Sequence, residues 1–296
     1  MAVIFYIIKE QNMSVNKSYV IWNNKGGVGK STITFHVALV YAEDNLDRDV
    51  IVVDMCPQAN SSSMLMGGGK KSESKLRGLI SQDEPKTIVG YITDATLNLK
   101  GDLLLDNYVT HLNGINSKLS DNLYLLSGDG NLELIAPLLS ERAEATPLSV
   151  SDNPWRDIHL IIKKLTQKKL KSDKPCTFFI DTNPSFAIYT QLAIVGADKL
   201  LVPINADDSS IFAIIGLFNL VWGTSKAHPV YGKYTFAVKA KDHNLELPKI
   251  SFLLGNRFTQ KKGAAHAFKA LSNEAINTMY SEYKDHPDRF ESSEKK

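Results

Sequence analysis

The sequence predicts an α/β fold, in which a single domain is built on a mostly parallel, twisted sheet with helices on both faces. Three observations carry this prediction. Short apolar runs alternate with segments of helical length, which is the pattern of βαβ units. A glycine-rich stretch at residues 23–37 directly follows one apolar run and opens a helical segment. A chain of 296 residues with 43% apolar residues can also bury one large core.

The alternating segments give the expected elements in order. The expected strands are residues 19–22, 50–54, 122–126, 177–181, 199–203 and 250–254. The expected helices are residues 30–44, 132–144, 155–170, 186–195, 209–224 and 263–283. Residues 67–75 are rich in glycine and lysine and are expected to form a surface loop. Residues 227–248 lack helical periodicity and could hold a short hairpin. The polar end of the chain is expected to fray.

Composition limits the functions that the chain can serve. The net charge is only +2, so attraction to nucleic acid or to an anionic membrane must come from a local cluster. Cys56 and Cys176 are the only cysteines, too few for a disulfide framework. No apolar run approaches the roughly 18 residues of a membrane span, and the run at residues 3–8 lacks the basic flank of a signal peptide. We therefore expect a cytoplasmic protein that does not act in a membrane.

The stretch KGGVGKST carries the chemistry of a phosphate-binding loop. Its three glycines let backbone N–H groups wrap a polyphosphate, and the helix that follows points its positive end at the same place. Lys30 adds a charge for the β- and γ-phosphates, Ser31 has the hydroxyl that suits Mg²⁺, and Thr32 can make a further phosphate contact. Because the loop lies between a strand and a helix, the fold class is refined to a single-domain P-loop NTPase. Asn24 occupies the place of the usual first glycine.

These residues resemble the deviant phosphate-loop ATPases of the ParA/MinD family, in particular the ParA group of partition ATPases. VVDMCPQANSSS resembles the family's D-x-D-P-Q-x-N segment, and FFIDTNPSF resembles its h-h-h-D-x-x-P-S segment. ADKLLVPINADDSSIFAI and LLGNRFTQ resemble two later family segments. The resemblance covers about residues 20–283. It implies an N-terminal extension at residues 1–18, an ATPase domain at 19–284 and a polar C-terminal tail at 285–296. The extension could be an added edge strand or a mobile tail, and Met13 could be the natural start.

The resemblance implies ATP and Mg²⁺ as cofactors and assigns residues to them. The residues expected to bind ATP are Lys25, Gly26, Gly27, Val28, Gly29, Lys30, Ser31, Thr32, Asn256 and Arg257. Asn256 is expected to face the adenine. Lys25 is expected to reach across a two-fold interface to the partner's nucleotide, so that ATP, and not ADP, favours a homodimer. Asp181, at the end of an apolar strand, is expected to hold Mg²⁺ with Ser31 and Asp54.

Catalysis is expected to involve Lys25, Lys30, Asp54 and Cys56, and Cys56 departs from the family pattern. It replaces an aspartate that orients or deprotonates the attacking water in relatives, and a thiol is a poor substitute at neutral pH. Three outcomes are open: slow hydrolysis, which we favour because positioning and electrostatics supply much of phosphoryl transfer, rescue by Asp54, Gln58, Asp207 or Asp208, or binding without turnover.

The expected partners are double-stranded DNA, a second copy of the chain and an adaptor. Nine basic residues face two acidic ones, Asp242 and Glu246, between residues 226 and 271. The basic residues are Lys226, Lys233, Lys239, Lys241, Lys249, Arg257, Lys261, Lys262 and Lys269. Such a cluster can neutralise DNA phosphates without reading bases. A ParB-like centromere-binding adaptor and a nucleoid-associated location are implied by the resemblance alone. A second basic run, residues 163–174, is expected to be the solvent face of a helix.

The sequence bears on four other functions. A membrane-cycling ATPase would need a basic amphipathic helix at the end of the chain, which the tail around Pro287 does not supply. A nitrogenase-type reductase would need cysteines that bridge a cluster between subunits. A small-molecule ligase of the same fold would not need Lys25 or the basic cluster. A clamp or scaffold that binds ATP with little or no hydrolysis stays open because of Cys56.

Overall fold

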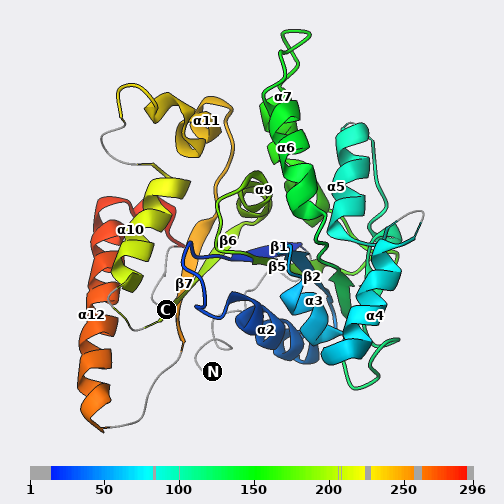
Figure 1. Cartoon of the computed structure of the whole chain (residues 1–296), viewed down its shortest axis with the longest axis horizontal. Helices are drawn as coiled ribbons and strands as arrows, with labels where there is room; N and C mark the ends of the chain where they lie inside the picture. Colours follow the sequence, from blue (N-terminus) through cyan, green and yellow to red (C-terminus); the bar gives the residue numbers. More distant parts are fainter. Residues whose placement is uncertain are drawn as a thin grey trace.

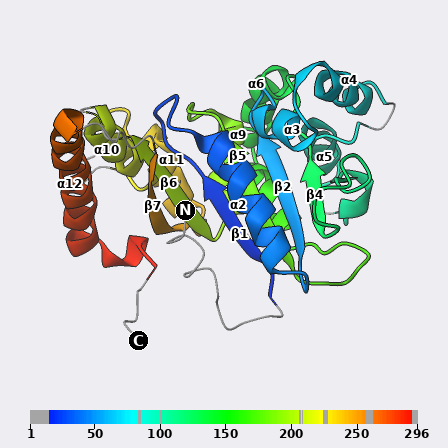
Figure 2. The same cartoon turned by 90° about the horizontal axis from the view of Figure 1, so that it is seen from below.

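The computed structural model describes residues 15–82, 85–99, 101–205, 207, 209–223, 228–256 and 262–291, with the backbone alone for residues 262–272. Within these residues one seven-stranded sheet has the order β3-β4-β2-β5-β1-β6-β7. The strands are β1 (Lys17–Ile21), β2 (Asp49–Met55), β3 (Thr110–His111), β4 (Leu123–Leu126), β5 (Cys176–Thr182), β6 (Lys199–Asn205) and β7 (Lys249–Asn256). All neighbours pair in parallel except β3 and β4. Figure 2 shows β7, β6, β1, β5, β2 and β4 side by side in this order. The predicted fold class is confirmed.

Helices cover both faces of this sheet (Figure 1). The α-helices are α2 (Lys30–Asp44), α3 (Asn60–Leu65), α4 (Gly69–Ile80), α5 (Ile88–Leu97), α6 (Leu132–Ala143), α7 (Pro154–His159), α8 (Ile161–Thr166), α9 (Ile188–Gly196), α10 (Ser209–Val221), α11 (Phe236–Asp242) and α12 (Lys262–Asp285). The 3₁₀ helices are η1 (Leu105–Asn107), η2 (Gly232–Tyr234) and η3 (Pro287–Arg289). No helix in the described ranges has the length and apolar character needed to cross a bilayer.

The two faces of the sheet build two cores, as the period of two along a strand requires. On β1, Tyr19 and Ile21 belong to the core under α2, α3 and α4. Val20 and Trp22 belong to the larger core with α5 through α10. Strands β2 and β5 are buried at every residue, which agrees with the apolar runs VIVV and FFI at their centres. The same strands therefore present their carboxyl ends as fixed positions between two helical layers.

The strand order places three connections together at one end of the sheet. β1 lies between β5 and β6, and the chain leaves β1 through α2 to reach β2 on the far side of β5. Residues at the ends of neighbouring strands are in register, with Ile21 opposite Asp181 and Asp54 opposite Asp181. In open α/β sheets ligands bind at this edge, where the connections diverge. The glycine-rich loop after β1 lies here.

Several predicted segments differ from the structure, each for a local reason. The predicted loop at residues 67–75 is wrong, because α4 begins at Gly69. Strong helix formers follow that glycine, and Leu76 and Leu79 pack on the core under α2, α3 and α4. The hairpin within residues 227–248 is also wrong: η2 and α11 lie there, and α11 buries Phe236 and Ala240, which are one helical turn apart.

Other boundaries change less. The single helix expected at residues 155–170 is two helices that meet at Leu160 and end at Thr166. The basic run at residues 163–174 was expected on a helix face, but most of it follows the second helix. The short strand β3 and the helices α3 and α5 were not predicted. The chain stays packed on the domain up to Glu291, although fraying was expected for its end. Phe290 is 9% exposed and forms a parallel bridge with Ile250. The N-terminal extension lies almost wholly outside the described residues, and β1 begins two residues before the predicted boundary.

Candidate functional site

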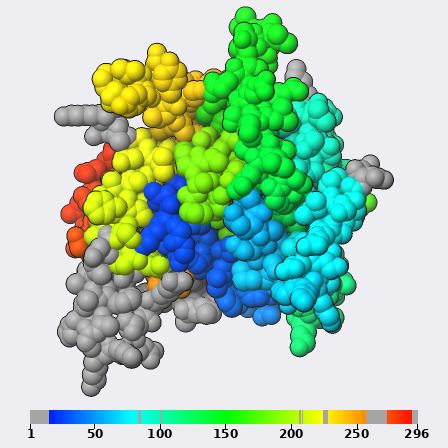
Figure 3. Space-filling model, in the orientation of Figure 1, coloured from blue at the N-terminus to red at the C-terminus, as the bar shows by residue number. Residues whose placement is uncertain are grey.

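The loop between β1 and α2 has the backbone shape that its glycines predict. Gly27 (φ 71°) and Gly29 (φ 87°) are in the left-handed region, which disfavours other residues. Space is open where side chains at Gly26 and Gly27 would lie. At Gly29 a Cβ atom would lie 2.2 Å from Nδ2 of Asn256, so a larger residue would also have to displace that side chain. Figure 3 shows this blue segment near the middle of one face of the molecule.

Lys30, the first residue of α2, is folded back over this loop. Its Nζ donates hydrogen bonds to the carbonyl oxygens of Asn23 (3.0 Å) and Lys25 (2.9 Å). Burial lowers the pKa of Lys30 to about 8, while the charge of Asp181 opposes that change. A bound phosphate would supply the counter-charge that the carbonyl oxygens supply only in part. The amine therefore lies where a polyphosphate in the loop would meet it.

Two carboxyl groups lie side by side beyond the loop, at the ends of β2 and β5. Asp54 and Asp181 are both fully buried. Asp54 accepts hydrogen bonds from the backbone N–H of Cys56 (3.0 Å) and from the N–H and hydroxyl of Ser62 (2.9 and 2.6 Å). Oδ2 of Asp181 is a buried atom for which the described residues supply no partner. Burial, and then the neighbouring Asp54, raise the pKa of Asp181 to about 7.

This pair of carboxyl groups fits a magnesium ion. Carboxylate oxygens and hydroxyls are the ligands that Mg²⁺ takes. The ion would offset the burial that raises the pKa of both groups, and the charge of Asp54 that raises the pKa of Asp181 further. The free Oδ2 of Asp181 is the oxygen that lacks a contact. The hydroxyl of Ser31 also faces Asp181 and favours its charged form. Asp54 is less available than Asp181 as a metal ligand, because its oxygens already accept three hydrogen bonds from the turn after β2 and from Ser62.

Cys56 does not supply a base at this site. Its thiol is 3% exposed and donates to Oε1 of Gln58, at 2.9 Å. Burial, and then the charge of Asp54, raise the pKa of Cys56 to about 12, so the thiol stays protonated at neutral pH. Gln58, one of the predicted substitutes, is thereby engaged with the thiol. A water activated by Cys56 would need a proton acceptor that this side chain does not offer.

Lys25 contacts a carboxylate of its own chain. Its Nζ forms an ion pair with both oxygens of Asp207, which follows β6, and lies 3.4 Å from the hydroxyl of Ser210. The ion pair is partly open to solvent, with the Lys25 side chain 19% and the Asp207 side chain 45% exposed. The predicted contact with a partner's nucleotide is a property of a dimer and stays a prediction.

The other predicted contacts lie around the same loop. Asn256, at the end of β7, donates from Nδ2 to the carbonyl oxygen of Val28 (3.0 Å), so its amide is within reach of the loop. Thr32 is exposed on the first turn of α2. Arg257 and Asp208 lie outside the described residues.

Some site residues were missed. Asn205, at the end of β6, bonds weakly to the loop carbonyl of Gly27 (3.5 Å), and Ser61 has a buried hydroxyl without a partner in the described part of the chain.

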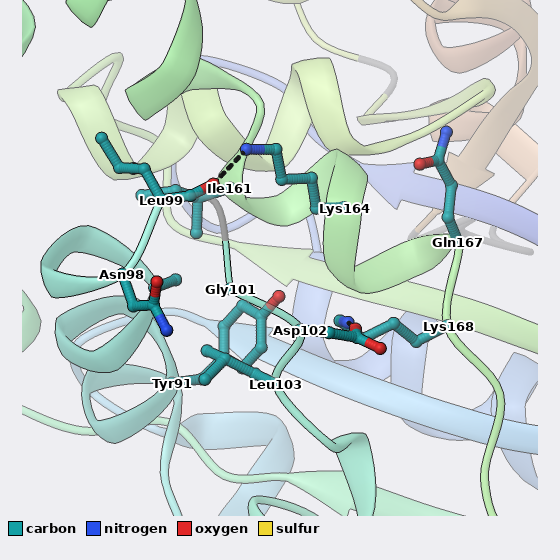
Figure 4. A pocket seen from close by; sticks show the side chains of 11 residues that line it. Tyr91, Asn98, Leu99, Gly101, Asp102, Leu103, Ile161, Lys164, Gln167 and Lys168 are labelled. Atoms are coloured by element: carbon teal, nitrogen blue, oxygen red, sulfur yellow. Dashed lines mark hydrogen bonds and ion pairs between the residues drawn. The ribbon is translucent and has the colours of Figure 1, made fainter.

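A cavity of about 590 Å³ lies elsewhere, between α5, α8 and the segment after α5. Figure 4 shows Lys164 donating to the carbonyl oxygen of Leu99 (2.8 Å), with Lys168 beside Asp102, its ion-pair partner. No residue of the glycine-rich loop lines this cavity. The predicted phosphate site is therefore separate from this cavity.

A parallel sheet, a left-handed glycine loop, a lysine at the start of a helix and two buried carboxyl groups together define a P-loop nucleotide-binding protein. The model of a family described as an AAA domain, AAA_31, matches residues 16–229, and the chain belongs to this family. Family membership and the shared fold confirm the predicted resemblance to the deviant phosphate-loop ATPases. No curated protein sequence matches the chain.

Solved structures agree on the fold. Cyanothece McdA in complex with ATP has a TM-score of 0.59 and 18% identity, over 89% of this chain and 80% of that one. A plasmid partition protein from Borrelia burgdorferi has a TM-score of 0.50 and 16% identity, over 90% and 99%. Cobyrinic acid a,c-diamide synthase from Mycobacterium smegmatis, with ADP and magnesium, has a TM-score of 0.51 and 15% identity, over 89% and 82%. At these identities the likeness establishes the fold alone. The reaction has to be inferred from the residues of the site.

Proposed function

We propose that this protein is a ParA-like ATPase that forms an ATP-dependent dimer, binds DNA without sequence preference and positions a plasmid, a chromosomal locus or another cargo. The observation that carries the proposal is Lys25, a second lysine in the phosphate loop, whose side chain is partly exposed and paired with Asp207. A lysine that served only its own chain would duplicate Lys30, which already bridges the loop carbonyl oxygens. A γ-phosphate shared with a second copy gives Lys25 a separate role.

Each chain would hold one nucleotide with magnesium. The backbone of the loop and Lys30 would bind the phosphates, Asn256 would face the base, and Ser31, Asp181 and, less directly, Asp54 would hold the metal. When bound, Mg²⁺ would neutralise charge on the β- and γ-phosphates. Lys25 would leave Asp207 for the nucleotide of the second copy. Because ADP lacks the γ-phosphate, only ATP would give Lys25 a contact that replaces its ion pair with Asp207. The bound nucleotide would therefore determine whether the protein is a monomer or a dimer.

Hydrolysis would be slow because the thiol of Cys56 keeps its proton. Positioning and charge stabilisation can still drive phosphoryl transfer when a base is missing. A clamp that binds ATP and does not turn it over is the second candidate, and the same thiol is the observation that favours it. The two candidates differ in phosphate release and in whether DNA-bound protein dissociates in excess ATP once an adaptor is added.

The basic cluster supports DNA binding in part. Lys233, Lys241 and Lys249 are exposed, whereas Lys239 pairs with Glu144. Lys226, Arg257 and Lys261 lie outside the described residues, and the side chains of Lys262 and Lys269 are not described. The Borrelia protein of the same fold is described as a plasmid partition protein, which supports the proposed cargo. Cobyrinic acid a,c-diamide synthase shares the fold as well, so ligase chemistry is the outcome to exclude.

Sedimentation velocity of the wild type with ATP, ADP or no nucleotide, each with Mg²⁺, tests the proposal. The wild type should be a dimer with ATP alone. Lys25→Ala should bind ATP and stay monomeric, and the matched control Lys163→Ala, which removes an ion pair with Asp198 far from the loop, should dimerise normally. Dimers of Lys25→Ala would refute the role of Lys25. If the ATP dimer fails to bind arbitrary DNA at low salt, the proposed DNA function is wrong.

A further inference from the structure

Ser61 has a buried hydroxyl that the site described so far does not use. It lies on α3, shortly after the segment that carries Cys56 and Gln58, and its side chain is fully buried. Its Oγ makes no hydrogen bond of normal length and angle with any part of the chain that the structure describes. Burying a hydroxyl without a partner is unfavourable, so native structures supply a protein group, a water or a ligand for almost every such group. An unused hydroxyl next to a predicted nucleotide site therefore indicates a missing ligand atom.

The surroundings of Ser61 show where that ligand atom would lie. The hydroxyl faces the carboxyl groups of both Asp54 and Asp181 and favours the charged form of each. Asp54 is already bonded to Cys56 and Ser62, whereas Oδ2 of Asp181 is free within the described residues. The hydroxyl of Ser31 approaches Asp181 from α2. Hydroxyls from α2 and α3 therefore both approach the carboxyl group of Asp181 at the end of β5.

The two serines that follow Ser61 have ordinary partners. The hydroxyl of Ser62 donates to Asp54 (2.6 Å) and accepts from the backbone N–H of Gly128 (2.9 Å). The hydroxyl of Ser63 lies 2.9 Å from that of Ser72 in α4. Three consecutive serines thus differ in role: Ser62 closes the turn after β2 through Asp54, Ser63 ties α3 to α4, and Ser61 is the one of the three that approaches both Asp54 and Asp181. The chain itself provides a matched control.

We propose that the Ser61 hydroxyl is a positioning group for the magnesium ion of the nucleotide, which it contacts through a water molecule of the ion. The proposal rests on the proposed binding of Mg-ATP. Mg²⁺ keeps several of its waters in proteins, and those waters need hydrogen-bond acceptors around the ion. On this side of the site Cys56 is turned to Gln58, so Ser61 supplies the oxygen. The Ser61 hydroxyl affects the affinity and the position of the metal ion, because it contacts a water of the ion and not a reacting atom.

The test measures how strongly Mg²⁺ supports nucleotide binding in Ser61→Ala, in Ser63→Ala and in the wild type. A fluorescent ATP analogue is titrated at fixed protein concentration in EDTA and over a range of Mg²⁺ concentrations. Loss of outer contacts typically weakens metal binding about 10-fold or more. Ser61→Ala should therefore need about 10-fold more Mg²⁺ for half-maximal binding, while its affinity in EDTA stays that of the wild type. Ser63→Ala should follow the wild type throughout.

Thermal unfolding separates this role from a structural one. Because Ala removes an unsatisfied buried hydroxyl, Ser61→Ala without ligands should melt at the wild-type temperature or above it. Its gain in melting temperature on adding Mg-ATP should be smaller than that of the wild type. A full gain and an unchanged Mg²⁺ requirement in Ser61→Ala would overturn the Ser61 proposal alone. If the wild type shows no Mg²⁺-dependent ATP binding, the proposed function fails together with it.

Discussion

Asp207 holds Lys25 in the single chain, and removing that carboxylate should strengthen the ATP dimer. Lys25 meets both oxygens of Asp207 and approaches Ser210. On the proposed mechanism this ion pair must break before the amine reaches the partner's nucleotide. Asp207→Asn keeps the shape of the side chain and removes its charge, so the amine is released without a large change in packing.

The size of the effect follows from the exposure of the ion pair. With side chains 19% and 45% exposed, the pair lies between a surface and a buried ion pair. Partly exposed pairs of this kind contribute at most about 1 kcal/mol, and a dimer breaks two of them, so the total is about 1 to 2 kcal/mol. The dissociation constant of the ATP dimer should therefore fall about 5- to 30-fold.

The assay is sedimentation equilibrium with Mg²⁺ and a non-hydrolysable ATP analogue over a series of protein concentrations. Asp198→Asn is the matched control, because it removes the ion pair with Lys163 on a different surface. The control should leave the dissociation constant unchanged. An unchanged or weaker dimer in Asp207→Asn would refute the competition between Asp207 and the partner's nucleotide. It would also indicate that Lys25 acts within its own chain.

Two further results follow from the carboxyl groups and the thiol. Cys56→Asp should raise the steady-state rate of phosphate release about 10-fold or more, because a carboxylate there can orient or accept a proton from water; no gain would mean that Cys56 does not limit hydrolysis. The raised pKa of Asp181, from 3.8 to about 7, means that the folded state holds this proton more tightly than the unfolded state. Metal-free protein should therefore lose a few kcal/mol of unfolding free energy as the pH rises from about 4 to 7, measured by urea denaturation in EDTA. Asp181→Asn should weaken that dependence and leave the part that comes from the raised pKa of Asp54. A flat pH profile in the wild type would contradict the burial of an uncompensated carboxyl pair.

The sequence predicted the parts of the structure that depend on local pattern. Helix α2 begins and ends where the loop motif and apolar spacing place it, and the six longer strands differ by at most two residues at either end. Asp54 and Asp181 could be paired from sequence because parallel strands bring their carboxyl ends to one edge. The helix α4 was missed because its glycines and lysines are typical of loops. The contacts that stabilise it, between Leu76, Leu79 and the core under α2, α3 and α4, form only in the folded chain.

The contacts of the site could be predicted only where a motif fixes them. Neither the ion pair of Lys25 with Asp207 nor the unbonded hydroxyl of Ser61 has a signal in the sequence, because each depends on a loop approaching from another element. The serine run after Asn60 looks uniform, yet tertiary packing gives its three members different partners. The contact of Asn256 with the loop likewise depends on the end of β7 lying beside Gly29, which the sequence does not specify.

The central claim is that two copies of this chain enclose ATP and that each donates Lys25 to the nucleotide of the other. A crystal structure grown with Mg²⁺ and a non-hydrolysable ATP analogue tests it most directly. The account predicts a two-fold dimer in which Lys25 has left Asp207 and contacts the γ-phosphate bound by the other copy. Nucleotide-loaded single chains, or a dimer in which Lys25 still pairs with Asp207, would contradict it.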